Sequence, residues 1–223
     1  MRRRPILSLG VACALGACAI APQGRDRFAD EPPTKVQALI GVSVFQDLDT
    51  QRADPGDPSR IAETDVSQMP MFGLYGQEQL GGEGVEVGFE GGVIVSWWRD
   101  QATIRDAGSG SIVAELDQEL IVTDLSAGLY ASTLLGSRVR VYFGAGPLMM
   151  FATQRTETEL STTRDSEFGL GGYARTGFEW VLDDGSMLGL GARAFRTNLE
   201  FDTAYPGVDL EGIQAMLTFT QWF

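Results

Sequence analysis

The chain has 223 residues, of which 43% are hydrophobic, a content typical of a folded protein rather than a disordered one. It contains no histidine, which excludes Ser-His-Asp and Cys-His catalytic sites and histidine-ligated metal sites. Its formal net charge of −13 argues against nucleic-acid binding, because phosphates require a basic surface.

Residues 1–17 have the pattern of an export signal peptide. Three arginines precede an apolar run from Ile6 to Ala17, which is too short to cross a bilayer as a helix of about 20 residues. The segment from Leu15 to Cys18 resembles a bacterial lipobox, so Cys18 is a candidate for lipidation. Ordinary cleavage after Ala19 is the alternative. Residues 18–35 are polar and contain prolines, which predicts a flexible lead-in.

From residue 36 onward, hydrophobic residues alternate with a period of two, which is typical of β-strands. Between Val139 and Phe151 every odd position is apolar, whereas the even positions include arginine, tyrosine and glycine. Other segments separate in the same way into an apolar face and a mixed face. The pattern predicts eight strands, at 36–46, 68–78, 84–98, 118–134, 138–153, 166–182, 186–201 and 208–223.

The connections between these strands alternate in length. Tight turns are expected at 81–82, 136–137 and 183–185, and long or polar loops at 47–67, 99–117, 154–165 and 202–207. Long loops at one end and short turns at the other are the plan of a transmembrane β-barrel. We therefore expect an all-β fold, an eight-stranded antiparallel up-and-down barrel over residues 36–223. Both termini then lie at the periplasmic end.

The apolar faces are expected to contact lipid, which offers no hydrogen-bond partners and so requires the sheet to close. Aromatic residues on these faces fall into two levels, as in the interfacial girdles of membrane barrels. The level near the loops contains Trp97, Phe151 and Phe168. The level near the turns contains Phe143, Phe178, Trp180, Phe219 and Phe223.

These features resemble the eight-stranded outer-membrane barrels of the opacity-protein and OmpA-type superfamily. The resemblance covers about residues 36–223 and is carried by the segments 141–150, 168–186 and 208–223. It implies an integral protein of the Gram-negative bacterial outer membrane, in contact with outer-membrane lipid. The ending with Leu217, Phe219 and Phe223 resembles the signal read by the barrel assembly machinery, although Gln221 departs from it.

The mixed faces carry eight charged residues that are predicted to point into the lumen. Buried charges are stable only when they are paired, so we expect ion pairs that fill this narrow interior. A three-residue hairpin loop at 183–185 would place Arg175 opposite Arg193. At least one of the two is then expected to meet Glu86 or Glu90, with Glu179 as the same-strand alternative. The predicted lumen residues are Glu86, Glu90, Asp124, Glu179, Arg138, Arg140, Arg175 and Arg193.

The leading functional prediction is a non-enzymatic, monomeric barrel with a structural or surface-interaction role, without cofactor or metal. Glu86 and Glu90 lie about 13 Å apart along one strand, too far for a glycosidase carboxylate pair. The lipid-modifying and proteolytic barrels rely on a histidine, which is missing here. Two alternatives stay open. One is a conduit for small solutes or ions, and the other is a lipocalin-like lipoprotein that binds an apolar ligand inside.

Overall fold

The computed structural model describes residues 34–46, 50–54, 57–64, 68–82, 84–106, 112–157, 162–201 and 205–223. The predicted signal peptide, Cys18 and the lead-in up to residue 33 lie outside these residues. Within the described part of the chain, no helix is long and apolar enough to cross a membrane.

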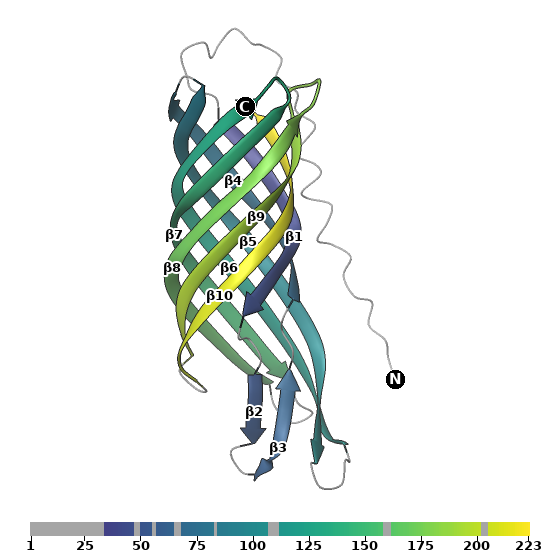
Figure 1. The fold of residues 1–223 in the computed structure, drawn as a ribbon. Helices are drawn as coiled ribbons and strands as arrows, with labels where there is room; N and C mark the ends of the chain where they lie inside the picture. Colours follow the sequence, from purple (N-terminus) through teal and green to yellow (C-terminus); the bar gives the residue numbers. More distant parts are fainter. Residues whose placement is uncertain are drawn as a thin grey trace. The chain divides into compact units, whose positions relative to one another are not determined.

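Eight of the ten strands that the described residues form make a closed antiparallel barrel (Figure 1). Each barrel strand pairs with the next one along the chain, and β1 also pairs with β10, which closes the sheet. This confirms the predicted fold class. The barrel strands are β1 (Thr34–Gln46), β4 (Gln68–Gly81), β5 (Val85–Asp106), β6 (Ile112–Leu135), β7 (Val139–Glu157), β8 (Thr162–Val181), β9 (Met187–Phe201) and β10 (Tyr205–Trp222).

The first predicted loop contains two further strands. Within 47–67, β2 (Thr50–Asp54) and β3 (Asp57–Thr64) form a hairpin. This hairpin joins the barrel sheet where Arg60 and Ile61 of β3 pair with the outer end of β5. The sequence does not reveal it, because the segment lacks the alternation of an apolar and a polar face on which strand prediction depends.

Two strand pairs also continue into segments that the sequence assigns to loops. The β5–β6 ladder runs out to Arg105 and Ile112, and the β7–β8 ladder to Glu157 and Thr162. Backbone pairing needs no hydrophobic residues, so a ladder can continue after the apolar face has ended. The loops at this end are therefore shorter than predicted, and the strands longer.

The two faces of the barrel strands differ as the alternation predicts. On β8, Leu170 is 64% exposed on the outside, whereas the neighbouring inward positions, including Tyr173 and Arg175, are buried. Leucine and phenylalanine make up most of the exposed large hydrophobic residues of the outer face. An outward apolar face is the reverse of a lipocalin, so the structure opposes the lipocalin-like alternative.

The turn between β8 and β9 fixes the register of the lumen. The amide of Leu182 donates to the carbonyl of Ser186 at 2.8 Å, and Gly185 has a positive φ of 84° that favours glycine. The carboxylate of Asp184 accepts hydrogen bonds from the amide (3.0 Å) and hydroxyl (2.6 Å) of Ser186, which lower the pKa of Asp184. As predicted, this turn sets Arg175 directly opposite Arg193.

Candidate functional site

The interior of the barrel is the candidate site, and it divides into two halves. Toward the tight turns lies an ionic half, built on the ion pairs of Lys35, Arg140, Arg175 and Arg193. Toward the loops lies an apolar half. The apolar half consists of Phe45, Met69, Met71, Ile94, Leu120, Val122, Leu148, Met150, Ala152, Phe195 and Leu210.

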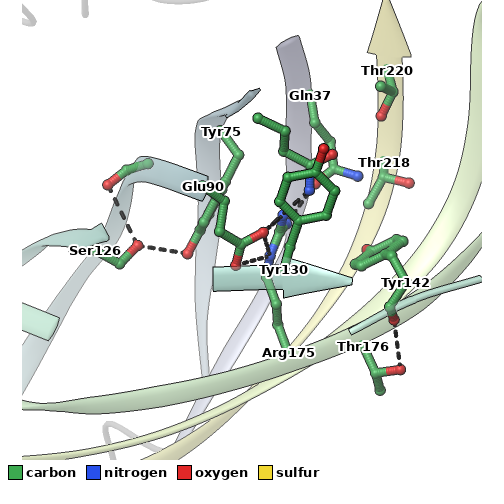
Figure 2. A network of polar contacts seen from close by, with 12 residues as sticks. Gln37, Tyr75, Glu90, Ser126, Tyr130, Tyr142, Arg175, Thr176, Thr218 and Thr220 are labelled. Atoms are coloured by element: carbon green, nitrogen blue, oxygen red, sulfur yellow. Dashed lines mark hydrogen bonds and ion pairs between the residues drawn. The ribbon is translucent and has the colours of Figure 1, made fainter. Parts of the chain in front are cut away.

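Glu90 of β5 is the centre of one cluster in the ionic half. Both of its carboxylate oxygens face Arg175 of β8, with Nε–Oε1 at 2.9 Å and Nη2–Oε2 at 2.5 Å. Tyr173 donates to Oε1 at 2.9 Å, and Gln77 donates to Oε2 at 3.1 Å. The guanidinium of Arg175 lies 3.9 Å from the ring centroid of Tyr75 (Figure 2). This is the contact across the lumen that the register of Arg175 and Arg193 predicts.

Glu179, on the same strand as Arg175, organises a second cluster with no exposed surface. Its Oε2 accepts from Arg140 at 2.8 Å, while Oε1 accepts from Gln37 at 2.6 Å. The hydroxyls of Thr218 and Thr220 also donate to Oε1, at 3.1 and 2.6 Å. Gln37 further accepts from Arg175 at 2.6 Å, so the two clusters form one network.

Asp124 and Arg193 form a third pair at the border with the apolar half. The guanidinium binds the carboxylate through two hydrogen bonds, at 2.8 and 3.0 Å. Gln214 accepts from Arg193 at 2.7 Å and donates to Ser43 at 3.0 Å. Arg193 is therefore paired, but with Asp124 rather than with Glu86 or Glu90.

The fourth pair is formed by Lys35 and Glu86 at the turn end. Tyr130 also donates to Glu86, and Ser132 does so at 3.2 Å. The ammonium of Lys35 lies 4.3 Å from the ring centroid of Trp222 on the adjacent strand. Lys35 is not among the predicted lumen residues, because the sequence pattern places residue 35 in the lead-in. Lys35 is in phase with the inward residue Gln37, and this period of two could have revealed it.

The apolar half differs from the prediction, which expected paired charges throughout the lumen. Met69, Met71 and Met150 are almost completely buried within it. On β7 the inward positions change from Arg140 and Tyr142 near the turn to Leu148 and Met150 near the loop. That change along one strand was the available evidence for two different halves.

Interior tyrosines explain several of the inward glycines. A Cβ atom added at Gly177 or Gly191 would lie 2.5 or 2.6 Å from the hydroxyl oxygen of Tyr142. A Cβ added at Gly92 would lie 2.6 Å from the ring of Tyr75. The rings lie over glycines of neighbouring strands, which leaves room in the narrow lumen for both the rings and the guanidinium groups.

The prediction for Arg138 is wrong. This residue lies in the turn between β6 and β7, and its side chain is 72% exposed, at 3.9 Å from the carboxylate of Asp183. The alternation of β7 does not extend into the turn, where a residue can follow the chain outward into solvent. The other seven predicted lumen charges face the interior.

The predicted girdle residues lie on the outer face. Phe151 and Phe168 are exposed neighbours, with ring centroids 5.2 Å apart, on the loop side, where Trp97 is also exposed. Phe178 and Trp180 lie 6.2 Å apart on the turn side. Phe143 and Phe223 are exposed and Phe219 is half-buried. Three further exposed aromatics, which the prediction omitted, are Phe72, Phe89 and Trp222.

Four carboxylates of the described interior, those of Glu86, Glu90, Asp124 and Glu179, are each bound to an arginine or lysine. In the described part of the chain, no three His, Cys, Asp or Glu side chains gather to hold a metal ion. What this arrangement can do is fill the lumen and tie strands across it.

No family model and no curated protein matches the sequence. Among solved structures, the chain is similar to Ail, the attachment invasion locus protein of Yersinia pestis, in complex with the heparin analogue sucrose octasulfate. Identity is 11% and the TM-score 0.52, over 86% of this chain and 99% of Ail. Neisserial surface protein A (11% identity, TM-score 0.44) covers 85% and 97% of the two chains. The likeness to Ail shows that the chain has the fold of the eight-stranded outer-membrane β-barrels.

Proposed function

We propose that this chain is an integral, monomeric barrel of the bacterial outer membrane, with a structural or surface-interaction role and no enzymatic activity. The observation that carries the proposal is that charged side chains are buried inside the barrel while large hydrophobic side chains are exposed outside, the reverse of a water-soluble protein. Arg175, Arg193 and Glu179 are buried, whereas leucines such as Leu170 and Leu217 are more than half exposed. Such a surface is stable in lipid and unfavourable in water, where exposed apolar patches promote association.

The filled interior supports a closed barrel over a conduit. Four ion pairs with their hydrogen-bond partners tie the ionic half across the lumen. In the described apolar half, methionine, leucine and phenylalanine side chains form most of the interior, and the buried hydroxyls of Ser43 and Ser96 are hydrogen-bonded to each other. Ions would have to cross both halves, and the hydrophobic side chains of the apolar half cannot replace their water.

The first experiment is electrophoresis of the detergent-folded full chain with and without boiling. A membrane barrel is expected to migrate differently before boiling, because its closed sheet resists SDS. The chain should also remain in membranes washed with carbonate. Identical migration under both conditions, together with release by carbonate, would contradict the proposal.

The second experiment is single-channel recording of the purified chain in planar bilayers. A closed barrel gives no discrete conductance steps. Reproducible steps in the parent protein would favour the conduit. A matched recording of Glu90→Gln tests the role of the ionic half. If the ion pair of Glu90 with Arg175 helps to close the lumen, its removal should raise the conductance above that of the parent.

Orientation and biogenesis belong to the same proposal. Because β1 and β10 begin and end beside the tight turns, both ends of the barrel would lie in the periplasm. A protease added outside intact cells should then leave tags at the two termini uncut. The assembly machinery would recognise the last strand, with Leu217, Phe219 and Phe223. Replacing Phe223 by Ser should lower the amount of folded barrel in the membrane.

A further inference from the structure

The pairing of β6 with β7 is interrupted halfway along the two strands. By register, Ala127 and Gly128 of β6 lie opposite Pro147 and Gly146 of β7, but these two pairs are missing from an otherwise continuous ladder. Proline has no amide hydrogen to donate to a neighbouring strand, which explains the interruption. These four residues are called the Pro147 gap below.

The hydrogen-bond pattern shows which backbone group loses its partner. The amide of Val181 on β8 donates to the carbonyl of Arg138, just before β7, at 2.8 Å. Backbone groups of successive residues point alternately to the two neighbouring strands, so the odd-numbered residues of β7 face β6 and pair there with odd-numbered residues. The carbonyl of Ala127 therefore points toward Pro147, where the amide donor of a regular pair is missing.

Small residues leave the Pro147 gap open to the outside of the barrel. The register partner of Ala127 on β5 is Gly91, and that of Pro147 on β8 is Gly172, so neither neighbour offers a side chain that covers the backbone. Ala127, Pro147 and Gly172 are themselves exposed. The gap lies midway between the two aromatic levels of β7, at a depth where lipid supplies no hydrogen-bond donor.

Inside the barrel, the cluster of Glu90 with Tyr173 and Arg175 spans the Pro147 gap. Glu90 belongs to β5 and its two partners to β8, so their hydrogen bonds bridge the two strands that form the gap. Glycines let this cluster lie against the wall. A Cβ at Gly128 would lie 2.7 Å from the hydroxyl oxygen of Tyr173, and one at Gly144 would overlap the carboxylate of Glu90.

We propose that the Pro147 gap is the point where the barrel wall opens locally, and that the Glu90 cluster is a clasp that holds it shut from inside. With one backbone hydrogen bond fewer, β6 and β7 separate here at a lower free-energy cost than other strand pairs. The opening leads from lipid to paired charges, so it is a site of local motion and not a passage for apolar molecules. The inference rests on the proposed membrane location, since water would otherwise satisfy the carbonyl.

The test is hydrogen–deuterium exchange of the full chain folded in lipid nanodiscs, read by NMR as protection factors. The amides of Ala127 and Leu129 flank the unpaired carbonyl, whereas Gly191 and Met216 pair in an uninterrupted part of the β9–β10 ladder. In the parent chain, the first two amides should be protected about tenfold less than the second two. Pro147→Ala supplies the missing amide and should remove this difference.

Two further variants separate the proline from the clasp. Pro70→Ala is the matched control, because Pro70 is also an exposed proline but lies beyond the last pair of the β4–β5 ladder. It should leave the protection of Ala127 and Leu129 unchanged. Tyr173→Phe removes only the hydroxyl that binds Glu90, and should lower the protection of these two amides by about fivefold.

The outcomes separate the local opening from the membrane proposal. Equal protection of all four amides in a parent chain with heat-dependent migration overturns the opening point alone. Weak protection that persists in Pro147→Ala overturns the role of the proline. If Tyr173→Phe lowers the protection of Gly191 and Met216 equally, the cluster stabilises the whole barrel and is not a clasp. A parent chain without heat-dependent migration overturns the proposed function and this inference with it.

Discussion

The two halves of the lumen fill the same narrow barrel in different ways. In the ionic half, each of the four carboxylates is bound by a cation, and Glu90 and Glu179 also accept from hydroxyl and amide donors of several strands. In the apolar half, side chains such as Met71 and Leu148 fill the space without directional contacts. The ionic half depends on specific charged and polar partners, whereas the apolar half depends on the total volume of its side chains.

The difference teaches what each half contributes to the barrel. A buried ion pair adds little net stability, but the loss of one partner is costly because a charge remains buried and unpaired. The ionic half therefore penalises any strand register that separates its partners. Apolar packing tolerates substitutions of similar volume and contributes stability through buried area. We infer that the ionic half specifies register and the apolar half seals and stabilises.

The largest effect is expected from breaking the ionic half at its centre. Glu90→Gln leaves the guanidinium of Arg175 buried without its carboxylate, which should lower the free energy of unfolding by about 3–5 kcal/mol. Urea unfolding of the lipid-reconstituted chain, followed by tryptophan fluorescence, measures the change. Adding Arg175→Met should restore part of the loss, because no unpaired charge remains.

Glu78 provides the matched control for that experiment. It lies on β4, one residue from Gln77 of the Glu90 cluster, but points to the exposed outer face. Glu78→Gln should change stability by less than about 0.5 kcal/mol. If Glu90→Gln is equally mild, the ionic half does not act as a matched network, and the comparison between the halves fails.

A smaller loss is expected in the apolar half. Met71→Ala removes a buried side chain and should cost about 2–3 kcal/mol, the lower part of the usual range, because neighbouring methionines are flexible enough to fill some of the space. Met71→Leu keeps the volume and should cost below about 1.5 kcal/mol. The same urea titration applies. A large loss with Met71→Leu would mean that this half also depends on exact shape.

Gly171 and Gly172 are adjacent on β8, and they allow the same substitution to be compared on the inner and the outer face of the barrel. A Cβ at inward Gly171 would lie 1.9 Å from the carbonyl oxygen of Arg196, whereas at outward Gly172 its nearest neighbour lies 3.6 Å away. Gly171→Ala should therefore cost about 1–2 kcal/mol through overpacking, and Gly172→Ala should be close to neutral. Equal effects on the urea midpoint would show that the backbone adjusts freely here.

The smallest effect is expected outside the lumen, at the β8–β9 turn. Hydrogen bonds from Ser186 lower the pKa of Asp184, so their contribution is fully present above the unfolded-state pKa and is lost as pH falls through the lower folded pKa. Asp184→Asn should reduce stability slightly near neutral pH, and the difference should disappear as pH falls through the lowered folded-state pKa of Asp184. Urea midpoints near neutral pH and in acid test this. A difference that persists in acid would assign the effect to geometry rather than charge.

Much of this architecture follows from alternation, because a period of two assigns each residue to one face of a strand. That is enough for the eight barrel strands and for Leu170 outside, while the contact of Arg175 with Glu90 also required the register of the hairpin at 183–185. Alternation cannot place a residue in a turn, which explains the error at Arg138. It also cannot reveal strands without an apolar face, such as β2 and β3, since their pairing depends on backbone groups that every residue carries.

The seam between β1 and β10 has a consequence for the order of folding. Lys35 pairs with Trp222, residues near the two ends of the described chain, while the other barrel pairs join strands that follow one another. Contacts between distant residues carry the largest loop-closure entropy and slow folding. Closure of the seam is therefore expected to be the last and slowest step, after the hairpins have assembled. Lys35, which contacts Trp222 across the seam and Glu86 across the lumen, would slow its reopening.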